Sequence, residues 1–203
     1  INSIFPNESL SANANLQKTI GKLKGTIGGN VSLSKSTSTV VSFRDTDNDP
    51  NTPPVQVGQD RESKSFTKSL RTRISSNFRT APNFEFGYNV SINDYNQGGV
   101  ENKFITHSPF LNLDILFLKN FTFTSRYTYN NYKNEVRTLN NYSFLDLDLT
   151  YQKKDSKWEY SLEMTNALNT SAINRDNTNA IFTSTSSYII QPRYTVFSIK
   201  YNL

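Results

Sequence analysis

The residues best able to do chemistry here are a set of acidic side chains and a single histidine. Asp146 and Asp148 alternate along one segment, and Glu159 and Glu163 follow on the next. Paired carboxylates can carry out acid–base chemistry. His107 is the sole histidine and cysteine is absent, so a Ser-His-Asp triad or a His/Cys zinc site lacks parts. We therefore predict a non-enzymatic protein with no catalytic residues and no cofactor, in which these carboxylates contact arginines or another domain.

A second acidic group has the spacing of a calcium loop. Asp45, Asp47 and Asp49 place carboxylates at alternate positions. An EF-hand needs glycine at its sixth position and glutamate at its twelfth, where this chain has Pro50 and Gln56. The EF-hand motif therefore fails, and two readings stay open: a looser calcium site and a plain solvated loop.

The elements that must position these residues are β-strands. Apolar side chains recur at every second position, as at Leu111, Leu113, Ile115 and Phe117, and helical periodicity is nearly absent. This pattern predicts about nine strands, at residues 9–20, 23–44, 63–79, 83–96, 101–118, 120–133, 138–153, 157–169 and 186–203.

The connections between these strands are of two kinds. Short turns are predicted at 21–22, 80–82, 119–120 and 154–156, and long polar loops at 45–62 and 170–185. All the short turns fall at one end of the sheet, which is typical of outer-membrane β-barrels, with tight turns on one side and extended loops on the other. The chain would then begin in an outer loop, which indicates part of a larger barrel.

The two faces of the predicted sheet differ sharply. Aromatic residues follow the short turns on one face, at Phe84, Phe121, Trp158 and Tyr160, where an interfacial girdle would lie. The other face is ionisable, and a sandwich core could not bury it without a large desolvation cost. Its predicted lumen-facing residues, candidates for plug or ligand contacts, are Arg71, Arg73, Glu85, Asp114, Arg126, Asp146, Asp148, Glu159 and Glu163.

Composition agrees with an all-β, antiparallel transmembrane barrel wall. Hydrophobic residues make up 35% of the 203 residues, whereas aromatic residues make up 13%. No apolar run approaches the roughly 18 residues that a membrane-spanning helix needs. The net charge of +5 comes from scattered lysines and arginines, so we expect no nucleic-acid partner. A soluble β-sandwich binding module of the adhesin type is the alternative fold.

The chain's tail resembles the last strand of outer-membrane barrels. Phe197, Ile199 and Tyr201 alternate toward the terminal Leu203, which stands where the family usually has phenylalanine. The resemblance implies that this strand is recognised by the barrel-assembly machinery.

Residues 144–203 resemble the end of TonB-dependent receptors from Bacteroidetes. The resemblance lies in strand segments 145–151 and 158–163, the element Asn166-Ala167-Leu168-Asn169, and Pro192-Arg193 before the last strand. It implies that residues 1–203 are the C-terminal part of an outer-membrane barrel of about 22 strands. A plug domain and a TonB-coupling segment would lie N-terminal to this sequence.

The function that this resemblance implies is nutrient import across the bacterial outer membrane. The chain would supply barrel wall and outer loops, with the lipid bilayer, the rest of the barrel, the plug and TonB as its partners. A passive pore, or a structural or assembly component of an outer-membrane complex, is the alternative.

Overall fold

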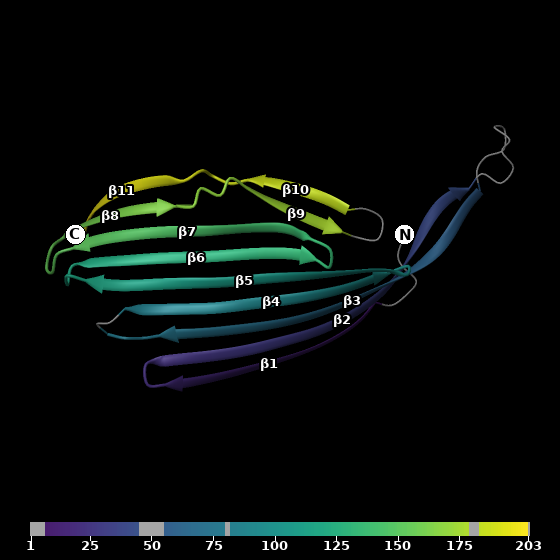
Figure 1. Ribbon diagram of the computed structural model, residues 1–203, viewed down its shortest axis with the longest axis horizontal. Coiled ribbons are helices and arrows are strands. Elements are labelled where there is room, and N and C mark those ends of the chain that lie inside the picture. The colour runs from purple at the N-terminus through teal and green to yellow at the C-terminus, as the bar shows by residue number, and fades with distance from the viewer. Residues whose placement is uncertain (1–6, 45–54, 80–81, 179–182, 203) are drawn as a thin grey trace.

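A computed structural model of the protein describes residues 7–44, 55–79, 82–178 and 183–202 (Figure 1). Every regular element in these ranges is a β-strand, which confirms the predicted all-β, antiparallel class. The described ranges contain no helix of the length and apolarity required to cross a membrane.

The main element is an antiparallel sheet of nine strands, and β11 lies beside β8 at its end. Among the described residues, the edge strands β1 and β11 each pair on one side. The sheet strands are β1 (Glu8–Ile20), β2 (Leu23–Arg44), β3 (Val55–Ser76), β4 (Asn83–Gln97), β5 (Val100–Phe117), β6 (Phe121–Asn134), β7 (Thr138–Gln152), β8 (Trp158–Thr165) and β11 (Tyr194–Tyr201). The strands β9 (Ala172–Thr178) and β10 (Thr183–Ile189) form a separate hairpin.

The connections define two ends of the sheet. At the short-turn end β1 is followed by β2, β3 by β4, β5 by β6 and β7 by β8, and the described turns there are 21–22, 118–120 and 153–157. The long-loop end also has two tight turns, in the four-residue gaps 97–100 and 134–137 that the predicted strands leave. Gly98 and Gly99 join β4 to β5 with φ of 57° and 85°, as a two-residue hairpin turn requires. The side chain of Asn134 accepts hydrogen bonds from the N–H groups of Val136 and Arg137, at 3.0 and 2.8 Å, in the other turn.

Two predicted loops are wrong in extent. Residues 55–62 belong to β3 and pair with 37–44, so β2 and β3 project beyond β4 as a two-stranded ribbon (Figure 1). The predicted loop 170–185 contains β9 and the start of β10. The predicted last strand, 186–203, is interrupted between Ile189 and Tyr194, where Pro192 lacks the N–H that a strand ladder needs.

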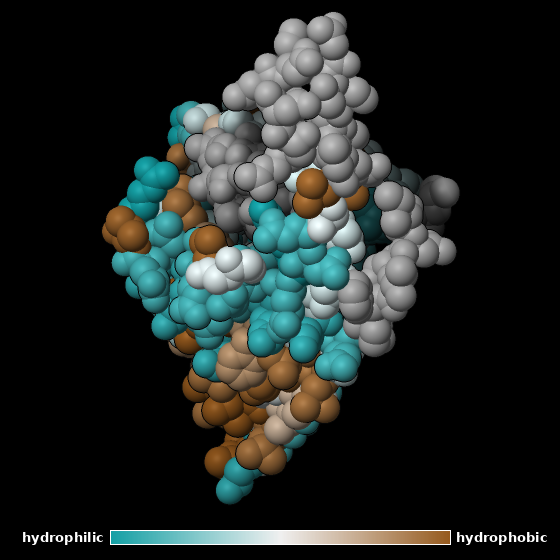
Figure 2. All heavy atoms as spheres, turned by 90° about the vertical axis from the view of Figure 1, so that its right-hand side faces the viewer, coloured by the Kyte–Doolittle hydropathy of each residue, from teal (hydrophilic) through white to brown (hydrophobic). Residues whose placement is uncertain are grey.

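The register assigns every strand residue to one of two faces, because directly paired residues point the same way. One face, called the polar face, contains Lys24, Arg73 and Glu85 together with the residues paired to them and every second residue along the same strands. The opposite face, called the apolar face, contains Leu70 and Phe86 and the residues related to them in the same way. The described residues include no buried hydrophobic side chain, since no second layer covers either face. Figure 2 shows hydrophobic and hydrophilic side chains in separate patches on the surface of the molecule.

Candidate functional site

The register places all the predicted lumen-facing residues on the polar face. Arg71, Arg73 and Glu85 lie on β3 and β4, whereas the others lie on β5 to β8. Successive strand pairings place these residues on the same face. From β3 to β4 the pairs are Arg73↔Gly87 and Ser75↔Glu85, from β4 to β5 Glu85↔Asn112, and from β5 to β6 Asn112↔Arg126 and Asp114↔Thr124. From β6 to β7 the pair is Arg126↔Asp146, and from β7 to β8 the pairs are Asp148↔Glu163 and Gln152↔Glu159.

Two of the acidic side chains on this face bind neighbouring hydroxyl groups. Asp114 accepts a hydrogen bond from the Thr124 hydroxyl at 3.0 Å, and Asp148 accepts one from the Thr150 hydroxyl at 2.9 Å. Asp148 and Glu163 are opposite each other, which is unfavourable for like charges. In the described part of the chain, the one ion pair that joins two of the predicted residues is Arg73–Glu85, 3.6 Å from Nε to Oε1.

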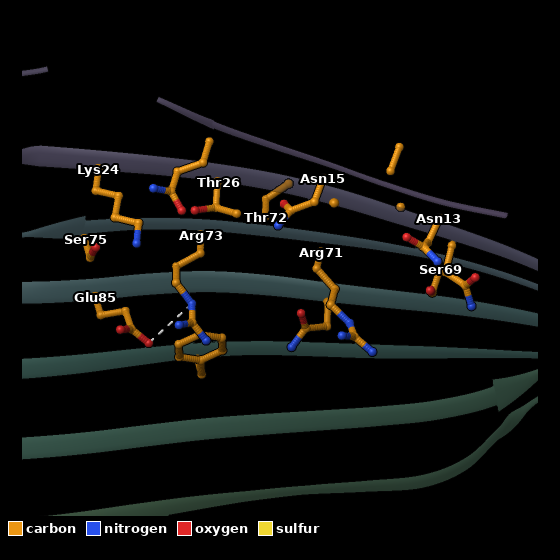
Figure 3. A pocket seen from close by; sticks show the side chains of 17 residues that line it. Asn13, Asn15, Lys24, Thr26, Ser69, Arg71, Thr72, Arg73, Ser75 and Glu85 are labelled. Carbon is orange, nitrogen blue, oxygen red and sulfur yellow. Dashed lines mark ion pairs between the residues drawn. The ribbon is translucent and has the colours of Figure 1, made fainter. Parts of the chain in front are cut away.

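The other half of the polar face is hollowed. A cavity of about 740 Å³ opens between β1 and β5, and the cationic side chains of Lys24, Arg71 and Arg73 extend into it with Glu85 beside them (Figure 3). Its remaining lining is mostly amides and hydroxyls, including Asn13, Asn15, Thr26, Asn30, Ser69, Ser75 and Asn89. The sequence analysis did not identify Lys24 or these amides as site residues. The two-residue alternation along β1 and β2 could have placed those of β1 and β2 on the same face as the two arginines.

An aromatic ring supports one of these arginines. Phe110 lies over Gly87, where an added Cβ would overlap the ring. The guanidinium of Arg73 lies 5.6 Å from the centroid of that ring, within range of a cation–π contact. Arg73 is therefore held from two sides, by Glu85 and by Phe110, although its side chain is 55% exposed.

The apolar face carries a band of hydrophobic side chains. On β4 the band runs from Phe84 to Ile92, which is about nine residues. Toward the C-terminus it continues through Leu162, Phe197 and Ile199, which are 45%, 62% and 56% exposed. A single-layer sheet therefore presents a continuous apolar surface with nothing from the described chain on it.

A row of aromatic rings bounds this band at the short-turn end. Phe117 and Phe121 stack at 5.3 Å between centroids, Phe121 and Tyr151 lie 4.7 Å apart, and Tyr151 and Tyr160 lie 6.3 Å apart. Trp158 and Tyr201 lie 4.8 Å apart in the same row. Phe121, Trp158 and Tyr160 thus lie where the sequence predicted aromatics, now as members of one row that crosses from β5 to β11.

Charged pairs bound the same face toward the long-loop end. The Glu62 carboxylate lies 2.7 Å from the Lys64 Nζ and 3.5 Å from the Lys35 Nζ. Lys68 pairs with Asp94 at 3.5 Å. The hydrogen bond from Lys64, followed by the charge of Lys35, lowers the pKa of the Glu62 carboxyl below its ordinary value.

His107 lies in the apolar band and pairs with a tyrosine. Its Nδ1 is 2.5 Å from the Tyr88 hydroxyl, and the two rings stack with centroids 6.1 Å apart. This contact satisfies both polar groups on an otherwise hydrophobic surface. The described residues contain no group of three or more His, Cys, Asp or Glu side chains that could hold a metal ion.

A buried asparagine with three side-chain hydrogen bonds lies in the turn after β8. Asn166 is 3% exposed and adopts a φ of 53°. Its Nδ2 donates to the carbonyls of Thr170 and Gln191 at 2.9 and 3.0 Å, and its Oδ1 accepts from the Thr170 N–H at 2.9 Å. Its own N–H donates to the Asp146 carboxylate at 2.9 Å. The turn is therefore tied to both β7 and the segment that leads into β11.

A second contact joins the same two segments. The Arg193 N–H donates to the Asn169 side chain at 3.1 Å, and the Arg193 guanidinium donates to the Ala167 carbonyl at 3.4 Å. The two elements that carry the resemblance to TonB-dependent receptors, 166–169 and 192–193, are therefore in direct contact.

The remaining sequence-predicted sites fall partly outside the described residues. Phe197, Ile199 and Tyr201 project from the apolar face of β11, whereas Leu203 lies outside the described ranges. Asp45, Asp47 and Asp49 also lie outside them, so the calcium hypothesis stays a prediction. No protein-family model matches the chain, and no curated protein or solved structure is significantly similar to it.

Proposed function

We propose that this sheet is part of the wall of a bacterial outer-membrane β-barrel, in a transporter of the TonB-dependent kind that imports a nutrient ligand. The observation that carries the proposal is the two-faced single layer. One face carries an uncovered apolar band, whereas the other bears all the predicted lumen-facing ionisable residues. In water an uncovered apolar face of this extent is unfavourable, whereas lipid on one side and an aqueous lumen on the other satisfy both faces.

The dimensions of the apolar band support the membrane assignment. A tilted strand crosses the hydrocarbon with about 9–11 residues, which matches the run from Phe84 to Ile92. The aromatic row would lie at one membrane interface and the Glu62–Lys35–Lys64 pairs beyond the other. The short-turn end then faces the periplasm, and the ribbon of β2 and β3 projects outward from the cell.

The open edges set a requirement. Unpaired N–H and C=O groups are costly in hydrocarbon, so β1 and β11 cannot both remain edges in a membrane. The proposal therefore includes further strands, from the same or another chain, that close the barrel. Import coupled to TonB is supported by the resemblance of residues 144–203 to the ends of such receptors.

Planar-bilayer recording of the intact protein tests the transport assignment. A plugged transporter gives no steady open-channel current, and addition of a ligand leaves the bilayer closed. Large, steady currents would instead assign the protein to the passive pores. Recovery of the chain as a folded, detergent-free monomer would contradict both membrane functions.

A further inference from the structure

The two signs of charge are unevenly distributed over the polar face. Lys24, Arg71 and Arg73 lie on β2 and β3, with Glu85 as the carboxylate among them. Five strands further along the chain, the acidic residues of β7 and β8 outnumber the cations Arg126 and Lys200 that lie opposite two of them. Arg71 and Asp148 are four strands apart, about 19 Å at about 4.8 Å per strand. This separation exceeds the screening length of about 8 Å in physiological salt, so the acidic half does not neutralise the cationic half.

Two of the three cations have no anionic partner. Within the described residues, no carboxylate lies within ion-pair distance of Arg71 or Lys24. Arg71 has Gly28 opposite it on β2 and Asn89 opposite it on β4. Gly28 contributes no side chain, and the Asn15 amide lies over it, with Oδ1 3.3 Å from where a Cβ would be. The amides of Asn15 and Asn89 add neutral donors to the lining of the hollow.

Arg73 is prepositioned beside this space. Glu85 holds its Nε, and the Phe110 ring supports the guanidinium plane. Such an arrangement lowers the entropy lost when the other N–H groups bind a ligand. Guanidinium groups match the geometry of phosphate and carboxylate oxygens.

We propose that this hollow binds a small multivalent anion through phosphate or carboxylate groups. Its volume of about 740 Å³ suits a small molecule, and its lining supplies a net excess of positive charge with amide donors around it. Arg71 and Lys24 bind the anion directly, Arg73 binds it from the Phe110 side, and Glu85 limits the affinity. The inference rests on the proposed function, because the polar face must line an accessible aqueous lumen.

Calorimetric titration of the intact protein with inorganic pyrophosphate tests the inference, in a neutral detergent at low ionic strength. We expect saturable binding that weakens as salt rises. Arg71→Gln should weaken it by tenfold or more, as loss of a charged hydrogen bond predicts. Glu85→Gln should strengthen it severalfold, because it removes the carboxylate that repels the anion, while Phe110 still supports Arg73. A parallel titration with citrate compares carboxylate with phosphate.

Lys24→Gln and Lys200→Gln form a matched pair, since both remove one lysine from the polar face. Lys200 lies on β11, opposite Glu159 and outside the hollow. Only Lys24→Gln should weaken pyrophosphate binding. Equal effects of the two variants, or no binding by the intact protein, would overturn the inference. Lipid accessibility of the apolar face, measured separately on the same samples, shows whether the barrel itself has formed.

Discussion

Replacement of Asn166 by glycine gives the sharpest test of the turn that connects β8 to β11. The substitution removes three side-chain hydrogen bonds, to Thr170 N–H, Thr170 C=O and Gln191 C=O. Glycine is the appropriate choice because Asn166 has a φ of 53°, and glycine adopts positive φ without steric strain. The measured loss then reports the side chain and not the backbone.

Asn169→Gly is the matched control. Asn169 has a φ of 56°, so the backbone effect of glycine is the same. Its exposed side chain accepts one hydrogen bond, from the Arg193 N–H. At about 1 kcal/mol for each hydrogen bond, Asn166→Gly should cost about 3 kcal/mol and Asn169→Gly about 1 kcal/mol. The difference of about 2 kcal/mol corresponds to about 30-fold in the local opening equilibrium.

Hydrogen–deuterium exchange of the intact protein measures this difference. The Ala167 N–H donates to the Leu145 carbonyl at 2.7 Å, and both substitutions leave that donor and acceptor in place. Its exchange should accelerate about 30-fold more in Asn166→Gly than in Asn169→Gly, while amides of β4 and β5 are unchanged. Equal acceleration in the two variants would refute the role assigned to the Asn166 side chain.

Three further predictions address the two faces of the sheet. Leu147→Arg places a charge in the apolar band and should reduce barrel stability by about 2–4 kcal/mol, measured by denaturant titration in lipid. Gly87→Ala forces Phe110 off its site, since the added Cβ overlaps the ring, and should cost about 1–3 kcal/mol in the same assay. Because its folded pKa is lowered, Glu62 contributes stability that is present above its ordinary pKa of 4.5 and is lost as pH falls through the lower folded value. A carboxyl NMR titration should therefore place the Glu62 midpoint below 4.5, and Lys64→Gln should raise it.

Each of these has a control within the chain. Asp148→Arg puts the same charge one residue away on the polar face, where it should be tolerated; equal losses at 147 and 148 would contradict the assignment of faces. The double variant Gly87→Ala with Phe110→Leu should recover stability, and failure to recover would exclude the ring overlap as the cause. A Glu62 midpoint at or above 4.5 would contradict the ion pairs with Lys35 and Lys64.

The sheet could largely be predicted from the sequence because period-two alternation fixes which residues share a face. The alternation alone predicts that Arg73, Glu85 and Arg126, on three different strands, share a face, and the register agrees. Residues 55–62 escaped prediction because Val55 and Val57 are their only apolar residues, too few for a hydrophobic alternation. Their strand forms by pairing with 37–44.

The details of the site depend on register and long-range contacts. The cationic hollow needs Gly28 opposite Arg71 and Phe110 opposite Gly87, and no local pattern specifies those pairings. The Asn166 turn depends on Gln191, which is 25 residues away in the chain. Local sequence patterns carry no information about such partners, so hydrogen bonds of this kind emerge only from the folded chain.

The central claim is that lipid covers the apolar face while water covers the polar face. Because the chain has no cysteine, single cysteines at consecutive positions 144–151 of β7 can carry nitroxide labels in the intact protein reconstituted into liposomes. Accessibility to oxygen should peak at Leu145, Leu147, Leu149 and Tyr151, and accessibility to a water-soluble nickel complex at the even positions between them. The claim would be contradicted if both reagents reached the odd positions equally, or if oxygen accessibility showed no two-residue period.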